Sequence, residues 1–240
     1  MAILHSDTAT QFRRGLVHGI PIALGYLSVS IGFGLLAVSG GLTIGQSLLI
    51  SMTNLTSAGQ LAGVQVMFSG GSLLEMAITQ LFINLRYALM SITLSQRLAD
   101  DVCLPERLGI GFFVTDEVFA VSSSQPETLS KRYMCGLVLL PYLGWALGTL
   151  LGAIAGATLP PIIRDGLGIM IYGMFIAIIV PPARESRPIR LTVLIAIALR
   201  CAFQYMPGLR TIPGGFAIVL CAVLASVVCA IRYPIRGDIK

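Results

Sequence analysis

Arg86 is the residue of this sequence that most needs a partner, because it is the only charged residue within ten positions on either side. A guanidinium stays protonated, and inside a membrane it is costly unless it faces water or an opposite charge. Asn84 and Tyr87 supply further donors and acceptors beside it. Two interpretations stay open. Arg86 either forms a structural ion pair, for instance with Asp116 or Glu117, or binds the carboxylate of a substrate.

Two adjacent carboxylates, Asp116 and Glu117, follow Thr115 within an otherwise apolar stretch. Desolvation and mutual repulsion favour the protonated form of paired carboxylates, so such groups suit the binding and release of protons. The same residues also fit the start of a helix, where Thr115 or Asp116 caps exposed amides and Glu117 favours the helix dipole. Asp116 and Glu117 are therefore candidates either for proton coupling or for a helix cap.

A polar interruption of small residues at positions 56–60 divides a long apolar stretch, and we expect a helix break there. The backbone amides at the start of the second half-helix would attract an anionic group such as an amino-acid carboxylate. A kink whose hydroxyls bond back to the chain is the alternative. Together with the residues around Arg86, the predicted substrate-binding set is Asn54, Ser57, Gly59, Gln60, Asn84, Arg86 and Tyr87.

The composition is that of a membrane protein. Of the 240 residues, 55% are hydrophobic and 11% are charged, and the mean hydropathy is +0.86. An ordinary soluble domain carries about 25% charged residues, and a helix needs roughly 20 apolar residues to cross a bilayer. We therefore predict an all-α membrane protein with six or seven transmembrane helices, some of them interrupted or re-entrant. The apolar stretches are residues 16–38, 44–68, 73–98, 137–159, 167–180, 191–205 and 216–231.

The basic residues between the apolar stretches predict the orientation in the membrane. If the N-terminus is cytoplasmic, all of them lie inside except Arg164 and Arg210, in agreement with the positive-inside rule. This assignment requires residues 40–72 to enter and leave on the outer side as a re-entrant pair of half-helices. If residues 40–72 and 109–122 cross the membrane instead, the charge asymmetry becomes weaker.

The chain is predicted to be one membrane domain over residues 1–240, with two hydrophobic parts that have faint similarity to each other. Its segments are the possible half-repeats 15–98 and 134–232 and the charged linker 99–133. One of the short matches between the halves joins residues 41–44 with 166–169. Repeated units in transporters commonly place the substrate site between the halves, near interrupted helices.

Glycines recur at every fourth position from Gly144 to Gly156, so one helix face carries almost no side-chain bulk over three turns. Such faces allow another helix to approach closely within lipid. Static packing is one interpretation of this pattern. A surface that slides during transport is the other.

Several other functions are not supported by the sequence. The net charge of +5 does not predict nucleic-acid binding, because the basic residues lie in short flanking loops and not in one stripe. The five cysteines are scattered without a CxxC pair, so neither a disulfide framework nor a zinc site is predicted. The sequence contains no metalloprotease, nucleotide-binding or nucleophile-elbow motif. We therefore expect neither a cofactor nor an enzyme.

Taken together, several of these segments resemble the AzlC-type proteins, the large subunits of bacterial branched-chain amino acid exporters. The resemblance covers nearly the whole chain in matching order, and the stretch at residues 115–120 is its most specific part. The other segments that carry it are the broken first span Gly19-Ile20-Pro21 through Gly25-Tyr26 to Phe33-Gly34, the Ala58-Gly59 break, the Arg86-Tyr87 pair and residues 148–153.

The resemblance implies a permease of the bacterial inner membrane that exports hydrophobic amino acids such as valine, leucine or isoleucine. It also implies a small membrane partner of the AzlD type. Members often carry a glutamine three residues after the glycine of the break, where this chain has Ala62, while Gln60 and Gln65 lie nearby. If that glutamine reads the substrate, the specificity of this chain can differ.

The resulting hypothesis places an amino-acid zwitterion near residues 57–60. Its carboxylate faces the start of the half-helix or Arg86, its ammonium faces Asp116 and Glu117, and its side chain faces an apolar wall. Because the sequence has no nucleotide-binding motif, an ion gradient is expected to drive export, with protons as the expected ion. The alternative is a passive channel or a scaffolding subunit whose polar residues serve helix packing.

Overall fold

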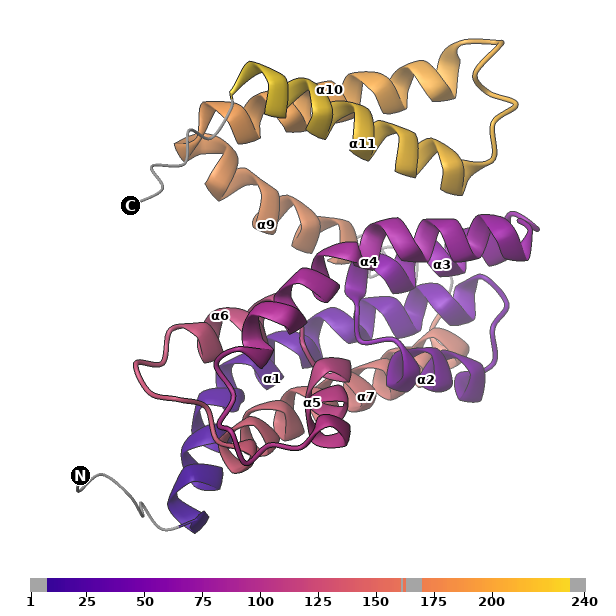
Figure 1. Cartoon of the computed structure of the whole chain (residues 1–240). Coiled ribbons are helices and arrows are strands. Elements are labelled where there is room, and N and C mark those ends of the chain that lie inside the picture. Colours follow the sequence, from indigo (N-terminus) through magenta and orange to yellow (C-terminus); the bar gives the residue numbers. More distant parts are fainter. Residues whose placement is uncertain (1–7, 161, 163–169, 234–240) are drawn as a thin grey trace. The chain divides into compact units, whose positions relative to one another are not determined.

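The computed structural model describes residues 8–160, 162 and 170–233, and all the regular secondary structure in them is helical (Figure 1). Five of the described helices are long and apolar enough to cross a membrane. They are α1 (Thr8–Ser39), α4 (Leu73–Ser95), α7 (Lys131–Thr158), α10 (Arg187–Tyr205) and α11 (Gly214–Arg232). The predicted all-α membrane class is confirmed, with five candidate spans in this part of the chain where six or seven were expected.

Four short helices form two interrupted pairs. α2 (Ile44–Thr53) is followed after three residues by α3 (Ser57–Phe68), and α5 (Leu104–Phe112) is followed after three residues by α6 (Asp116–Ser123). At 1.5 Å per residue, even the 12-residue α3 spans only about 18 Å, against a hydrocarbon core of roughly 30 Å. The predicted helix break is confirmed, and its non-helical residues are 54–56. The re-entrant path of residues 40–72 stays a prediction.

α9 (Met170–Glu185) covers most of the apolar stretch predicted at residues 167–180. The first residues of that stretch lie outside the part of the chain that the structure describes. Arg164 and the proposed repeat segment at residues 166–169 lie outside it as well. The internal repeat and the division into two halves therefore stay predictions.

The chain forms two compact units: residues 1–60 with 84–171, and residues 61–83 with 172–240. In the first unit, α1 and α7 pack side by side (Figure 1). Glycines make this contact, because a Cβ at Gly152 would collide with the Ile31 carbonyl of α1, and Gly148 lies equally close to the same helix. The small-residue face on α7 therefore lies in a close helix contact, and both interpretations, static packing and sliding during transport, stay predictions.

α1 continues through Pro21 without interruption, whereas the resemblance led us to expect a broken first span. That expectation is wrong. A proline removes one helix hydrogen bond and crowds the preceding turn, so the helix needs support from outside. α7 supplies it, since Gly15 and Gly19 before the proline and Gly34 after it all lie against the α7 backbone.

In the second unit, α10 and α11 form a hairpin with a small apolar core (Figure 1). α11 begins after Pro213, whose side chain cannot cap the first amides of the helix. Glu75 of α4 takes over this role, because its Oε1 accepts a hydrogen bond from the Gly215 amide at 2.6 Å. Glu75 is only 3% exposed and is the one buried charged side chain among the described residues.

Candidate functional site

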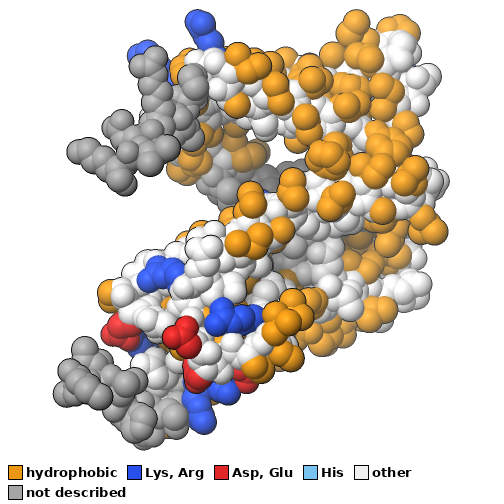
Figure 2. Space-filling model, viewed as in Figure 1, with side chains coloured by type: hydrophobic (Ala, Val, Ile, Leu, Met, Phe, Trp, Pro, Cys, Tyr) orange, Lys and Arg blue, Asp and Glu red, His pale blue; other side chains and the backbone are white. Residues whose placement is uncertain are grey.

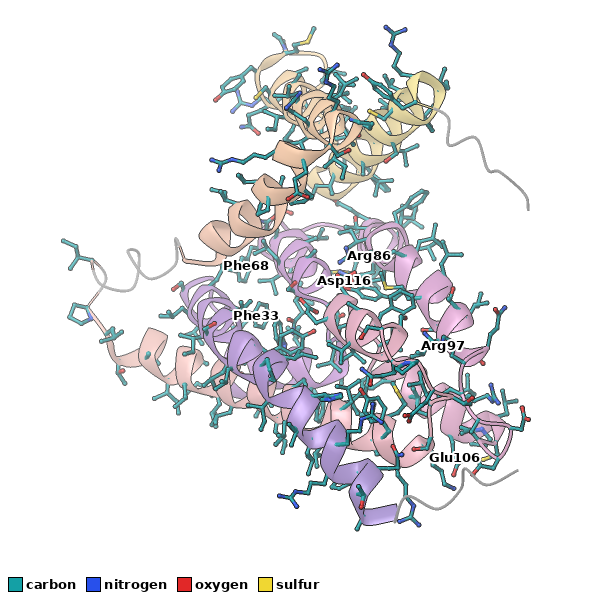
Figure 3. The ribbon with its side chains drawn as sticks, turned by 90° about the vertical axis from the view of Figure 1, so that its left-hand side faces the viewer. Phe33, Phe68, Arg86, Arg97, Glu106 and Asp116 are labelled. Atoms are coloured by element: carbon teal, nitrogen blue, oxygen red, sulfur yellow. The ribbon has the colours of Figure 1, made fainter. Side chains whose placement is uncertain are left out.

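Arg86 of α4 lies beside Asp116 of α6 (Figure 3). Its Nη2 is 2.8 Å from Asp116 Oδ2 and also donates a hydrogen bond to the Tyr87 hydroxyl at 3.0 Å. The ion-pair interpretation is confirmed, with Asp116 as the partner. The Arg86 side chain is still 48% exposed, so it can contact a further group. Asn84 shares α4 with Arg86, but side chains two positions apart point to different faces of a helix.

Thr115 is the N-cap of α6, and its side-chain oxygen accepts a hydrogen bond from the Val118 amide at 3.3 Å. Asp116 and Glu117 occupy the first turn, where the helix dipole favours negative charge. The helix-cap interpretation of this sequence is therefore confirmed. A role of the two carboxylates in proton coupling stays a prediction.

Tyr26 of α1 belongs to the site, although the residue pattern alone did not single it out. Its hydroxyl lies 2.5 Å from Glu117 Oε2 and 2.6 Å from Thr115 Oγ1. A phenol has one hydroxyl proton, so Tyr26 can donate to only one of these two oxygens. The other contact is a hydrogen bond only if the Thr115 hydroxyl donates to Tyr26. Because the carboxylate can only accept, Tyr26 donates to Glu117 and Thr115 donates to Tyr26. The ring is buried, with its edge against Trp145.

An apolar pocket lies next to this hydroxyl pair. Its cavity volume is only about 10 Å³, which is room for about one water molecule. Its lining comes from α1, from the two breaks and from α6 and α7, and consists of Tyr26, Leu55, Phe113, Thr115, Val118, Val138, Pro141 and Tyr142. The hydroxyl groups of Tyr26 and Thr115 are hydrogen-bonded to each other beside an otherwise mostly apolar wall. This pocket therefore joins the α2–α3 break to the N-terminus of α6.

The break between α2 and α3 carries the other predicted residues. Asn54 follows the end of α2, and its Oδ1 accepts a hydrogen bond from the Thr56 hydroxyl at 2.8 Å. Ser57 and Gly59 lie in the first turn of α3. The end of α2 carries a partial negative charge and the start of α3 a partial positive charge. The break therefore places a partial negative charge and a partial positive charge within a few residues of each other.

Gln60 lies beside the same break, in a buried group that we name the amide–hydroxyl cluster: Ser51 of α2, Gln60 of α3 and Thr149 of α7. Gln60 Nε2 donates to Ser51 Oγ at 3.1 Å, and Ser51 Oγ lies 2.6 Å from Thr149 Oγ1. All three side chains are buried, with Gln60 1% exposed. The Gln60 Oε1 atom accepts no hydrogen bond from the described part of the chain.

Ionic side chains of the first unit gather around its connecting loops (Figure 2). Arg14 pairs with Glu127 at 3.1 Å, and Arg97 donates to the backbone carbonyls of Ser123, the last residue of α6, and of Gln125 in the following loop. Lys131 pairs with Glu106 at 3.0 Å, and this hydrogen bond lowers the pKa of the Glu106 carboxyl. Arg14 and Arg97 thus lie at one end of the unit, as the predicted topology requires. The cytoplasmic placement of that end stays a prediction.

Comparison with known proteins gives consistent matches. The model of the family described as AzlC protein matches residues 21–159, which include the Arg86 pair, the pocket and the amide–hydroxyl cluster. An uncharacterized membrane protein of Archaeoglobus fulgidus is 33% identical over 182 residues, which are 74% of this chain and 79% of that protein. The inner membrane protein YgaZ of Escherichia coli is 25% identical over 198 residues, which are 80% of this chain and 81% of YgaZ. No solved structure matches the chain.

Proposed function

The chain belongs to the AzlC family of membrane proteins, and we propose that it is a secondary transporter that exports branched-chain or other hydrophobic amino acids. The observation that carries this proposal is the apolar pocket between the α2–α3 break and the N-terminus of α6. An aliphatic amino acid has a small apolar body and a charged head. The pocket offers a mostly apolar wall, and the helix ends beside it offer charge of both signs.

In this proposal the apolar pocket, which has room for about one water molecule in the described structure, widens to admit the substrate side chain. Its carboxylate binds at the start of α3, near Ser57 and Gly59, or at the exposed part of Arg86. Asn54, Gln60 and Tyr87 complete the polar surroundings, and Asn84 would take part from another face of α4. Arg86 supports the second option because a guanidinium can bind two carboxylates in different directions through its five N–H groups.

Asp116 and Glu117 are the proposed proton-coupling residues. The strength of the contact that each carboxylate makes depends on its charge. Asp116 pairs with Arg86, and Glu117 accepts a hydrogen bond from Tyr26. Protonation of Asp116 would weaken its contact with Arg86 of α4, and protonation of Glu117 would weaken its contact with Tyr26 of α1. Either event would loosen a helix from the N-terminus of α6. This link between a proton and a helix contact is what a proton-driven exporter requires.

We also propose a small AzlD-type membrane subunit as the partner and a bacterial inner membrane as the location, with the N-terminus in the cytoplasm. The positive-inside rule supports this orientation, because basic residues such as Arg14 and Arg97 lie at one end of the first unit. The E. coli relative YgaZ, an inner membrane protein, supports the location.

A scaffolding subunit or a passive channel is the second candidate. The observation in its favour is that several polar residues of the site already have structural partners, as Thr115 does in the cap of α6. In that case the polar groups would serve only to hold the short helices in place.

Counterflow in proteoliposomes tests the proposal. The purified chain is reconstituted with and without a small AzlD-type subunit, the vesicles are loaded with unlabelled valine or leucine, and uptake of the labelled amino acid is followed. We expect saturable counterflow that prefers branched aliphatic amino acids over charged ones. An imposed proton gradient should accelerate net efflux.

The alternatives predict different results in the same vesicles. Flux that does not saturate and does not respond to a gradient would indicate a channel. Absence of flux for every amino acid, even with the small subunit present, would indicate a scaffold. Empty vesicles provide the baseline for both comparisons.

A further inference from the structure

We infer that the amide–hydroxyl cluster of Ser51, Gln60 and Thr149 binds the α-ammonium group of the transported amino acid. This inference rests on the proposed function and adds to it the place where the positive end of the substrate is read. It differs from the expectation drawn from the sequence, which placed the ammonium against Asp116 and Glu117.

The starting observation is the Gln60 carbonyl oxygen. The side chain is 1% exposed, and Oε1 accepts no hydrogen bond from the described residues, while the Nε2 of the same amide is bonded to Ser51. Keeping a buried acceptor without a donor is unfavourable, and a ligand that brings a donor removes that penalty. The ligand should therefore carry N–H or O–H groups.

The number and kind of the neighbouring atoms fit an ammonium group. An ammonium has three N–H donors and no acceptor, so it needs several oxygens close together. Ser51 Oγ and Thr149 Oγ1 are 2.6 Å apart, and the Gln60 amide is bonded to the first of them. The cluster thus brings together three neutral side chains that can all accept, from three different helices.

The helix ends favour the same orientation of the substrate. The cluster includes Ser51 in the last turn of α2, where the partial charge is negative and a cation is stabilised. The start of α3, on the other side of the break, carries the opposite partial charge and suits a carboxylate. A zwitterion that bridges the break would therefore have its ammonium toward α2 and its carboxylate toward α3.

The carboxylates of α6 are less suited to this task in the described structure, because each already has a partner. Asp116 is paired with Arg86 at 2.8 Å, and Glu117 accepts the Tyr26 hydroxyl at 2.5 Å. An ammonium would have to displace these groups. The Gln60 oxygen needs no such displacement.

The test uses competition between two ligands that differ only in the ammonium group. Leucine and its des-amino analogue, 4-methylpentanoate, compete with labelled leucine for counterflow into vesicles that contain the wild-type chain or the Gln60→Met variant. Methionine keeps the length of the side chain but removes the carbonyl oxygen. We expect leucine to bind about tenfold to hundredfold more weakly to the variant, and 4-methylpentanoate to be unaffected.

Gln65→Met is the matched control, because Gln65 lies on the same helix and is exposed. It should behave like the wild type with both ligands. Thr149→Val, which replaces the hydroxyl with a methyl group of similar size, is the second variant and should show the same selective loss as Gln60→Met. It also keeps the test valid if Gln60→Met does not fold.

The outcomes separate this inference from the proposed function. If the wild type carries leucine but both variants keep its affinity, or lose affinity for leucine and 4-methylpentanoate equally, the ammonium assignment is wrong and the transport function stands. If the wild type carries no amino acid, the proposed function itself fails. Selective loss for leucine in either variant supports the assignment.

Discussion

The Tyr26 hydroxyl lies 2.5 Å from Glu117 Oε2, and this contact joins the middle of α1 to the first turn of α6. The two residues are 91 positions apart in the sequence. α6 has only eight residues and cannot be stable by itself, because an isolated helix of that length is marginal even with good helix formers. Its position therefore depends on contacts such as this one, which hold the Asp116 carboxylate toward Arg86.

Tyr26→Phe removes the hydroxyl and leaves the ring. We expect the free energy of unfolding to fall by about 1–3 kcal/mol, because a hydrogen bond to a charged group is lost. Transport should also fall, since α6 is no longer held. Tyr142→Phe is the control for stability, because its hydroxyl donates to the Met52 carbonyl and not to a carboxylate, so its effect on the free energy of unfolding should be smaller. Unfolding of the purified protein and counterflow measure the two effects, and equal stability of the two variants would contradict the prediction.

Arg86→Ala and Asp116→Asn should each reduce amino-acid efflux at least tenfold at normal expression. The first variant leaves a carboxylate and the second a guanidinium without its counter-charge, and both sites lie beside the predicted substrate route. Arg86→Lys should recover only part of the activity, because an ammonium lacks the planar fork of the guanidinium. The measurement is valine or leucine efflux from loaded cells. Unchanged efflux in both Arg86→Ala and Asp116→Asn would remove these residues from the mechanism.

Gly152→Ala should destabilise the protein by about 1–3 kcal/mol, because the added methyl group would meet the Ile31 backbone of α1. Gly25→Ala provides a matched control in the neighbouring helix, since no atom lies within 4 Å of a Cβ at that position. The control should lose no stability, because alanine is the better helix former. Thermal unfolding in detergent compares the two. The packing interpretation fails if both variants unfold at the same temperature as the wild type.

Glu75→Ala should lower the free energy of unfolding by about 1–3 kcal/mol, because the Gly215 amide at the start of α11 is left without its acceptor. Glu75→Gln should lose less, since its carbonyl oxygen can still accept. Gly215→Ala should be as harmful as Glu75→Ala, because its methyl group would collide with Thr79 Oγ1 and the Glu75 side chain. Gly214→Ala is the control for that position, with open space around its Cβ.

The Glu106–Lys131 pair predicts a small dependence of stability on pH. The hydrogen bond from Lys131 lowers the pKa of the Glu106 carboxyl below its ordinary value of 4.5. The contribution of the pair is therefore fully present above pH 4.5 and is lost as the pH falls through the lowered pKa. Thermal unfolding of the wild type and of Glu106→Gln across this range measures it. The difference between the two proteins should shrink on acidification, and a constant difference would exclude the pair as its cause.

Much of the fold could be predicted from local features of the sequence. Apolar stretches predicted the long helices, and the small polar residues around Ser57 predicted the break between α2 and α3. Both features depend on residues that are neighbours along the chain. Asp116 could be named as a partner of Arg86 because an isolated guanidinium requires an anion and few carboxylates lie in apolar stretches.

Other features depend on residues distant in the sequence and could not be predicted in this way. The resemblance led us to expect a break near Pro21, but packing against α7 keeps α1 continuous. The role of Tyr26 depends on Glu117, which lies 91 positions away in the sequence, so no local pattern indicated it. The role of Glu75 could not be predicted either, because its partner Gly215 lies 140 positions away in the sequence.

The close contact of α1 with α7 also limits how this protein can change shape. Where a glycine of one helix touches the main chain of the other, no side chain is present that could swing aside and let the helices part gradually. The two helices should therefore move together as one rigid body. Any alternation between inward and outward openings would then depend on the short helices α2, α5 and α6 that contact this pair, with the non-helical residues beside them as hinges.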